Sequence, residues 1–288
     1  MSRIACVILN YNSQELTTNL AKTISNFSSV DYIVVVDNNS NDGSKETLPK
    51  LEENSSKIKV ILETENLGYA KGNNRGAKFA IKELLCDLIV IANPDVTFSE
   101  EYITEVGKLI ASDSKILIAS AIAHDAYNRI SYCSYWSLPE FGDYTRKFFN
   151  ILEKRYQQKM LVKQTNMTDD YVITEAVSGA CFMARKEVFT ELGGFDENTF
   201  LYCEESILGG KVKKYGYKEA VTNKVFYNHN HLYSREDAAQ KIKCYKTMID
   251  SREYYLSEIL DCCKVKILFF RILSSVSLGI RKVIWNMR

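Results

Sequence analysis

The 288-residue chain has little of several features that would indicate particular classes of protein. It has three prolines, and no Pro-, Gly- or Ser-rich linker divides it. The 37 basic residues nearly equal the 36 acidic ones, so the net charge of +1 gives no global field for nucleic acid. No clean run of about 18 apolar residues is present, which argues against a membrane-spanning helix. The start also lacks the small-residue cleavage site of a signal peptide.

Paired cysteines are also absent. Eight cysteines occur, but no two form a C-x-x-C pair. Cys6, Cys86 and Cys181 lie within apolar runs, so we expect free and mostly buried thiols. This pattern favours a reducing compartment over a disulfide framework or a zinc site. We therefore expect a cytoplasmic protein of one large domain or two small ones.

What is present is an ordinary globular composition, with 46% hydrophobic and 25% charged residues. Apolar runs alternate with helical patterns through the first 120 residues, which predicts parallel strands joined by right-handed crossovers. The fold class expected is α/β, with a doubly wound sheet of the nucleotide-binding type. Strands are predicted near 3–9, 31–37, 58–62, 87–92 and 116–121, and helices over 13–27, 43–54, 70–85 and 99–112.

The second half is less regular. Residues 125–170 are rich in aromatic and charged side chains without clear periodicity, and are interpreted as an insertion or lid beside a site. Gly193-Gly194 is a plausible end for a helix near 186–192. A further helix is predicted from Glu204 to Gly216, a strand near 224–228, and helices over 235–287.

Asn93-Pro94-Asp95 is the most informative motif. It follows the apolar run 88–92, which reads as a buried strand that Pro94 ends. Asp95 therefore lies at the carboxyl end of a strand, where open α/β sheets bind ligands. A carboxylate there can hold a divalent cation against a diphosphate, because hard cations take oxygen ligands. The alternative is a simple Asn-Pro-Asp turn.

Two further segments carry polar groups at strand ends. Carboxylate and amide side chains there can read a nucleobase edge through hydrogen bonds; the candidates are Asn10, Asn12, Asp37 and Asn38. Turn formation and helix capping are favoured for residues 40–42.

A glycine-rich segment, residues 65–76, opens the next helix. Glycines permit close backbone approach and a helix N-terminus favours an anion; neither a Walker loop nor G-x-G-x-x-G is present. Close packing through Gly72 and Gly76 is an alternative that can hold at the same time. The binding candidates in this segment are Asn66, Gly68, Lys71 and Asn74, with Arg75 nearby.

Together these pieces resemble the family 2 glycosyltransferases of the GT-A fold, above all the rhamnosyltransferase-like enzymes of bacterial surface-polysaccharide synthesis. The resemblance covers about residues 3–234. It implies a GT-A catalytic domain over 1–234, with a donor half near 1–121 and an acceptor half near 122–234, followed by a helical extension, 235–288. The motifs that carry it are residues 7–12, 36–40, 65–68, 93–95, 178–180, 193–197 and 204–205.

The resemblance also implies roles for residues. Asn93 and Asp95 match the metal-binding D-x-D position, with Asp95 the direct ligand of Mn or Mg. His229 resembles a late metal ligand of the family, and imidazole can complete a Mn-type shell. Gly179 belongs to the Ser-Gly-Ala motif, which we group with the substrate-binding candidates.

Glu204-Glu205 resembles the acidic pair that opens a helix on the acceptor side, where the second acid is the general base. A sugar hydroxyl is a poor nucleophile, and a carboxylate within hydrogen-bond reach removes its proton during attack. We therefore expect Glu205 to be the base and Glu204 to shape the site. Acids are also favoured at helix starts for purely structural reasons.

The sequence departs from the family at Ile207, where an acid is usual. An inactive, donor-binding partner of another glycosyltransferase thus stays open as an alternative. A sugar-phosphate nucleotidyltransferase is a second alternative, but Asn10-Tyr11-Asn12-Ser13 lacks the Gly-rich basic loop that such an enzyme needs.

The C-terminal stretch carries a separate signal. Apolar residues recur at helical spacing from Val265 to Ile284, and six Lys or Arg but no acid follow Asp261. A basic amphipathic helix of this kind suits a membrane surface over 264–288; packing on the catalytic domain or in a homodimer is the alternative. The expected protein is an inverting transferase, peripheral on the inner membrane face, that moves a sugar from dTDP-rhamnose or a UDP-hexose to a lipid-linked glycan.

Overall fold

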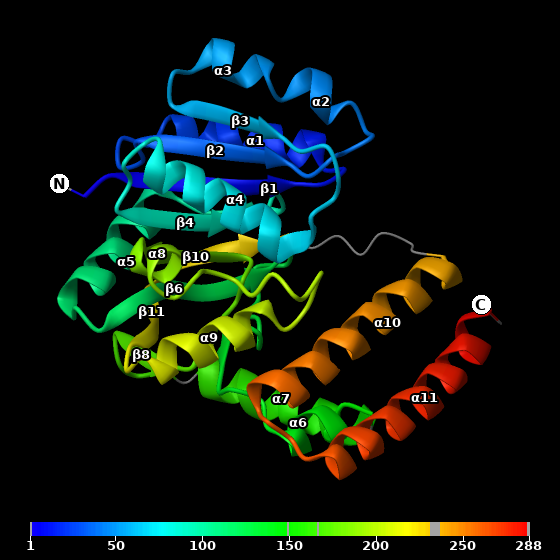
Figure 1. The fold of residues 1–288 in the computed structure, drawn as a ribbon. Coiled ribbons are helices and arrows are strands. Elements are labelled where there is room, and N and C mark those ends of the chain that lie inside the picture. Colours follow the sequence, from blue (N-terminus) through cyan, green and yellow to red (C-terminus); the bar gives the residue numbers. More distant parts are fainter. Residues whose placement is uncertain (1, 149, 166, 231–236, 287–288) are drawn as a thin grey trace.

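The computed structural model describes residues 2–148, 150–165, 167–230 and 237–286. Within these ranges nine strands form one mixed sheet, with helices on both faces (Figure 1). In spatial order the strands are β3 (Ile58–Leu62), β2 (Tyr32–Asp37), β1 (Ile4–Asn10), β4 (Leu88–Ala92), β10 (Cys181–Arg185), β6 (Ile116–Asp125), β11 (Lys218–His229) and β5 (Val96–Thr97), while β8 (Tyr171–Thr174) pairs with β11 outside this order.

The first four neighbours in this order run parallel, as the alternating pattern predicts. β10 lies antiparallel between β4 and β6, and β11 is parallel to β6. The sheet is therefore a mixed α/β sheet, as predicted, and the carboxyl ends of β1, β2 and β4 meet at one edge. Asn10 and Asp37 are register partners at that edge.

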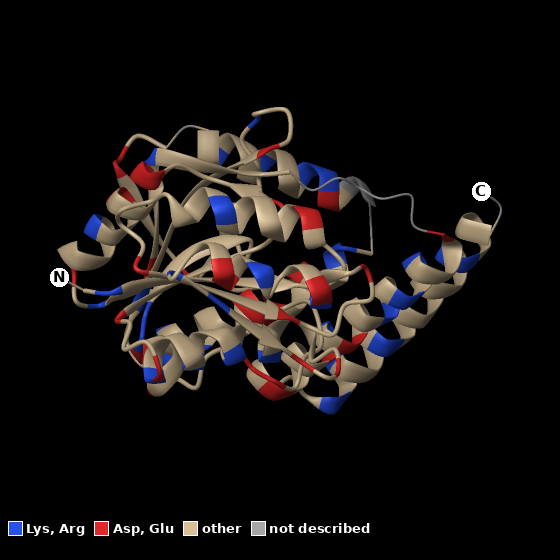
Figure 2. Cartoon of the chain, turned by 90° about the horizontal axis from the view of Figure 1, so that it is seen from above, with Lys and Arg blue, Asp and Glu red and all other residues tan. Residues whose placement is uncertain are grey.

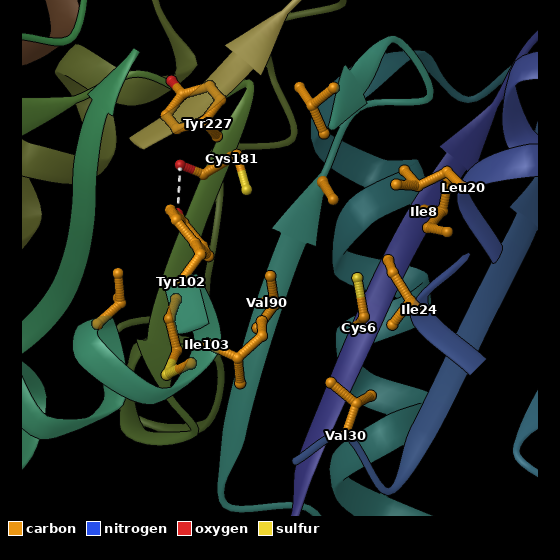
Figure 3. Close-up of a cluster of buried hydrophobic side chains, with 14 of the residues drawn as sticks. Cys6, Ile8, Leu20, Ile24, Val30, Val90, Tyr102, Ile103, Cys181 and Tyr227 are labelled. Carbon is orange, nitrogen blue, oxygen red and sulfur yellow. Dashed lines mark hydrogen bonds between the residues drawn. The ribbon is translucent and has the colours of Figure 1, made fainter. Parts of the chain in front are cut away.

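Each face of the sheet carries its own helices, because side chains of a strand alternate between faces. Cys6 and Ile8 of β1 face α1 (Gln14–Ser25) and α5 (Glu100–Ser112), in the cluster drawn in Figure 3. Ala5 and Val7 face the other way, toward α4 (Gly68–Lys82), α8 (Glu187–Thr190) and α9 (Glu204–Lys214). Both faces of the central strands are thus buried.

α4 packs closely on β1 through two glycines. A Cβ at Gly72 would collide with Leu9, and one at Gly76 would lie 2.5 Å from Cγ1 of Val7. The packing role considered for these glycines is therefore present in the structure, and it brings the start of α4 to the polar edge of the sheet.

A short strand pair, formed by β5 and the end of β11, completes that edge of the sheet. β5 follows Asn93-Pro94-Asp95 directly and pairs antiparallel with the end of β11, with His229 opposite Val96. The backbone N–H of Asn230 donates to the carbonyl oxygen of Asp95 at 2.9 Å. Asp95 and His229, 134 positions apart, are thereby neighbours.

The insertion and the C-terminal segment form a second assembly beside the sheet (Figure 1). The insertion contains β7 (Tyr135–Trp136), α6 (Phe141–Arg146) and α7 (Asn150–Thr165), and β7 pairs with β9 (Ala176–Val177). The C-terminal hairpin, residues 238–286, consists of α10 (Ala238–Tyr254), a π-helical turn η1 (Tyr255–Ile259) and α11 (Lys264–Asn286).

Ile207 of α9 joins this assembly to the main sheet. Its side chain is fully buried in an apolar cluster with Tyr144 of α6, Tyr255 and Leu256 of the hairpin, and Phe270 of α11. An acid at this position would place a carboxylate among apolar groups, which is costly. Ile207, where the resemblance leads us to expect an acid, therefore packs the C-terminal hairpin against α9.

The elements differ from the predicted ones in a few places. The predicted helix over 43–54 is two short helices, α2 (Ser44–Thr47) and α3 (Lys50–Asn54), separated at Leu48-Pro49. α7 was not predicted, and β11 is much longer than the predicted 224–228. In the part of the chain that the structure describes, no helix combines the length and the hydropathy needed to cross a membrane.

Candidate active site

The end of the second strand is fastened by a buried hydrogen-bond network. Asn10 Nδ2 donates to Asp37 Oδ1 at 2.7 Å and to the hydroxyls of Ser40 and Ser44, and its Oδ1 accepts from Thr17. Asp37 Oδ2 accepts from the backbone N–H of Ser40 at 3.2 Å. Asn10 and Asp37 are fully buried, so they hold the two strand ends together, and their contact with a nucleobase stays a prediction.

Asn12 and Asn38 fix the loops that follow these strands. Asn12 lies in the left-handed region with φ of 51°, and its Oδ1 accepts from the backbone of Asn41. Asn38 Nδ2 donates to Asn66 Oδ1 at 2.9 Å, and its Oδ1 accepts from the backbone of Leu67. The second and third strand ends are thereby tied together.

The glycine-rich segment, residues 65–76, connects these strand ends to the acidic pair Glu204-Glu205. Asn66 Oδ1 also accepts a hydrogen bond from the backbone N–H of Gly68. Gly68 has a φ of +80°, and a Cβ on it would lie only 2.6 Å from the carbonyl oxygen of Phe200. Tyr69 N–H donates to that same carbonyl at 3.0 Å. The loop that leads to Glu204 is therefore docked on the start of α4.

Asn74 and Lys71 have different surroundings. Asn74 is buried, and its amide exchanges hydrogen bonds with the backbone N–H and carbonyl of Phe195 and donates to Glu197 Oε1. It fastens the Gly-Gly-Phe-Asp-Glu loop to α4. Lys71 is exposed. A contact of either residue with substrate stays a prediction.

Asp95, which follows β4, lies beside His229, the last residue of β11. Asp95 Oδ2 is 3.4 Å from His229 Nε2, and the two side chains are 19% and 30% exposed. The backbone N–H of Asn93 donates to the carbonyl of Ala180 at 2.8 Å, which fixes the turn. One carboxylate oxygen and one imidazole nitrogen are thus presented together.

The carboxylate of Asp95 and the imidazole of His229 are side chains that could together bind a divalent cation whose other ligands come from a substrate. Among the described residues no group of three or more His, Cys, Asp or Glu could hold a metal by itself. Mn- and Mg-type cations are commonly held by one or two protein ligands together with phosphate oxygens. The pair can therefore serve a metal that arrives with a diphosphate.

Glu205 is docked on a glycine backbone. Its Oε1 accepts from the backbone N–H of Gly179 at 3.2 Å, and a Cβ on that glycine would lie only 2.7 Å from the same oxygen. The carbonyl of Gly179 accepts from the hydroxyl of Tyr69 at 2.7 Å. Only a residue without a side chain lets Glu205 approach in this way.

The environment of Glu205 makes it a better base. Burial raises the pKa of Glu205, while the hydrogen bond from Gly179 and the charge of Lys147 oppose that rise. A carboxylate whose pKa is raised toward the working pH takes up a proton more readily. Glu205 also lines a cavity of about 570 Å³ together with Ser178 and His229.

Two more acids lie close behind Glu205. Burial, and next the charge of Glu205, raise the pKa of Glu204 to about 8. Burial also holds the pKa of Glu219 well above its usual value, and Glu219 Oε2 accepts from the backbone N–H of Val177 at 2.9 Å. Glu204 is buried beside Glu205, and its role in shaping the site stays a prediction. Glu219 has no motif that would reveal it in sequence.

The turn before the acidic pair is strained. Tyr202 and Cys203 have φ of 78° and 70°, although neither is glycine. Such conformations cost on the order of 1–3 kcal/mol each and cluster at functional sites. No glycine marks this turn in the sequence, so it could not be predicted.

The sheet and these side chains define a class of protein: a nucleotide-sugar transferase fold of the GT-A type, with polar strand ends and an acid at the start of α9. The chain belongs to glycosyl transferase family 2, whose family model matches residues 5–193. The model of glycosyl transferase family 21 matches residues 108–286.

Three curated relatives are similar over most of the chain. A low-salt glycan biosynthesis hexosyltransferase of Haloferax volcanii is 27% identical over 70% of this chain and 59% of its own length. An O-antigen chain rhamnosyltransferase of Salmonella typhimurium is 25% identical over 83% of this chain and 70% of its own. An N-acetylglucosaminyl-diphospho-decaprenol L-rhamnosyltransferase of Mycobacterium tuberculosis is 24% identical over 64% of this chain and 62% of its own length. The chain thus spans less than two thirds of two of them.

Solved structures share the fold. A mannosyltransferase of Pyrobaculum calidifontis in complex with GDP-Man and Mn²⁺ has a TM-score of 0.62 at 17% identity, covering 98% of this chain and 73% of its own. GalNAc-T7 with UDP, GalNAc and Mn²⁺ has a TM-score of 0.60 at 16% identity, covering 80% and 44%. At this identity the likeness shows the GT-A fold alone.

Replacing Glu204 by Gln should remove a pH-dependent loss of stability. A carboxyl pKa that is raised in the folded state stabilises the fold at low pH, and this stability is lost as the pH rises from 4.5, the usual value, to about 8. The melting temperature of the unaltered protein should therefore fall over that interval, and that of E204Q should fall less. Exposed Glu191→Gln is the control, and an equal fall in E204Q contradicts the assignment.

Proposed function

We propose that the chain is an inverting, metal-dependent glycosyltransferase. It transfers a sugar from a nucleoside-diphosphate donor, dTDP-rhamnose or a UDP-hexose, to a hydroxyl of a lipid-linked glycan in surface-polysaccharide synthesis. The observation that carries the proposal is the Glu205 carboxylate, docked on Gly179 in the cavity that His229 also lines. Family membership and the names of the curated relatives support it.

In this reaction Glu205 accepts the proton of the acceptor hydroxyl. The hydroxyl oxygen attacks the anomeric carbon as the bond from that carbon to the diphosphate oxygen breaks, so a single displacement inverts the centre. Asp95 and His229 would hold the cation, which neutralises the charge of the departing diphosphate. Lys71 and Arg75 at the start of α4 are candidates to assist at the same edge.

The inactive-partner alternative rests on Ile207. Its complete burial beneath the hairpin gives that residue a packing role, which supports an active enzyme. Assays of transfer and hydrolysis over a panel of nucleotide sugars identify an inactive partner, which gives neither. A second assay with a nucleoside triphosphate and a sugar 1-phosphate identifies a nucleotidyltransferase, because only that enzyme joins the two and releases pyrophosphate.

Glu205→Gln should abolish transfer while donor binding persists. Loss of a general base costs roughly 10²- to 10⁴-fold in rate, and the amide keeps the size of the side chain. Transfer from a panel of nucleotide sugars and calorimetric binding of the nucleoside diphosphate with Mn²⁺ are the two measurements. Transfer at a near-normal rate would remove Glu205 from the base role.

Asp95→Ala should weaken the metal-dependent part of donor binding. Titrations of UDP, dTDP and GDP with and without Mn²⁺ measure that part directly. The matched control is Asp170→Ala, which removes an acid on the surface that pairs with Lys224. If the gain from Mn²⁺ is the same in D95A as in the unaltered protein, Asp95 is not a metal ligand.

The exposed side of α11 supports contact with a membrane surface. Apolar side chains three or four residues apart remain at least 45% exposed along it, and basic residues accompany them (Figure 2). Such a helix lies at a bilayer surface and is attracted by anionic lipid. The exposed apolar residues are Val265, Leu268, Phe269, Ile272, Val276, Ile280, Val283 and Ile284.

Ile272→Asp should reduce sedimentation with vesicles that contain anionic phospholipid, because it places a charge in the exposed apolar row. Gln158→Asp on exposed α7 adds the same charge elsewhere and should bind as the unaltered protein does. Equal binding of both variants would argue against α11 as the membrane contact.

A further inference from the structure

The cavity that contains Glu205 is enclosed by segments outside the sheet. Its walls come from α6 and α7 of the insertion, the start of α9, and both long helices of the C-terminal hairpin. α10 contributes Tyr245, Met248 and Arg252, and α11 contributes Arg281. The cavity beside Glu205, the proposed base, is therefore shaped largely by the insertion and the C-terminal hairpin, which contain few of the family motifs.

Cations outnumber acids among the side chains that line this cavity by four to three, the acids being Asp143, Glu153 and Glu205. Arg146 is offset by two acids, Asp143 at 2.6 Å and Glu153 at 3.7 Å. Three other cations line the same cavity and form no ion pair with any residue the structure describes: Lys147, Arg252 and Arg281.

Aromatic rings hold these cations in place. Lys147 Nζ lies 5.3 Å from the ring centre of Tyr144, and the guanidinium of Arg252 lies 5.4 Å from it. The guanidinium of Arg281 lies 4.6 Å from the ring of Tyr245. A ring face attracts a cation without neutralising it, so the donors of these side chains stay available to an anion.

Lys147 and Arg252 are close enough to act on each other. Burial, and next the charge of Arg252, lower the pKa of Lys147. The Nε of Arg281 is buried and has no hydrogen-bond partner among the described residues. Like charges gathered in a cavity destabilise the protein by themselves, and a ligand with two negative charges relieves that repulsion.

The position of the cations indicates which anion they meet. In the proposed function the diphosphate of the donor meets Asp95 and His229 at the sheet edge, and His229 also lines this cavity. The three cations come instead from the insertion and from the C-terminal hairpin, which extends beyond the sheet (Figure 1). α11 contributes Arg281 to the cavity and exposes an apolar row to the outside.

We propose that Lys147, Arg252 and Arg281 form a subsite for the diphosphate of a lipid-linked acceptor. The diphosphate bridges the three cations, the sugar attached to it reaches Glu205 in the same cavity, and the lipid leaves past α11. This inference rests on the proposed function, because it assigns the acceptor of that reaction. Arg and Lys bind phosphate oxygens through charge-assisted hydrogen bonds.

Calorimetric titration with geranylgeranyl diphosphate tests the subsite without any catalytic step. The dissociation constant should rise about tenfold or more in Arg252→Ala and in Lys147→Ala. Arg252→Lys, which keeps the charge, should lie between R252A and the unaltered protein. Lys246→Ala, which removes an exposed cation from the same helix, should bind normally, and geranylgeraniol should bind weakly to all.

Titrations with nucleoside diphosphates show whether the three cations bind the diphosphate of the acceptor or that of the donor. UDP, dTDP and GDP with Mn²⁺ should bind R252A and K147A as they bind the unaltered protein. Equal losses for the nucleotides and the prenyl diphosphate would assign the cations to the donor and overturn the proposal. Failure of the unaltered protein to bind the prenyl diphosphate, or unchanged binding in both alanine variants, would also overturn it.

The subsite and the proposed function can fail separately. Glu205→Gln should bind geranylgeranyl diphosphate at least as tightly as the unaltered protein, because it removes a negative charge from the same cavity, although it transfers no sugar. If E205Q retains transfer, the base assignment is wrong while the titrations still decide the subsite. Matching melting temperatures of the ligand-free variants show that a lost affinity reflects lost charge and not lost folding.

Discussion

The hydrogen bond from the backbone N–H of Gly179 to Glu205 is the interaction on which the site depends. It joins the segment before β10 to the start of α9, so the sheet itself sets the position of the carboxylate. Tyr69 fixes the same glycine from α4 through its carbonyl. In the proposed function this arrangement matters because a general base must lie within hydrogen-bond reach of the proton that it removes.

The apolar cluster around Ile207 makes α9 a packing element as well as the helix that carries Glu205. One turn of this helix presents Glu205 to the cavity and buries Ile207 against the insertion and the C-terminal hairpin. Tyr144 belongs to that cluster and also holds Lys147 and Arg252 against its ring. One continuous packing arrangement therefore fixes Glu205, the proposed base, together with Lys147 and Arg252.

Much of the sheet could be predicted from sequence because β1, β2, β3 and β4 are short apolar runs bounded by polar turns. The strand end at Asp95 was predicted for the same reason. α7 could not be predicted, since its apolar residues show no helical periodicity. The break between α2 and α3 was overlooked, although Pro49 marks it. For β10 the antiparallel direction depends on neighbours in space that the local sequence does not specify.

The roles of individual polar residues were harder to predict. Asn74 bonds to Phe195, 121 positions away, and an amide in a motif can bind backbone or ligand equally well. The left-handed turn at Tyr202-Cys203 carries no glycine, and Glu219 lies in an apolar strand with no motif. These features depend on tertiary contacts, whereas a family pattern marks Glu205 in the sequence, and its role as the base stays a prediction.

The most direct measurement of the central claim is the transfer rate of Gly179→Ala. The added methyl group would lie 2.7 Å from Glu205 Oε1 and must displace the carboxylate. Transfer is predicted to fall by about a hundredfold or more, with nucleoside diphosphate and Mn²⁺ bound as before. Gly142→Ala, where a Cβ meets nothing within 4 Å, is the control. Transfer by G179A at the rate of that control would contradict the account.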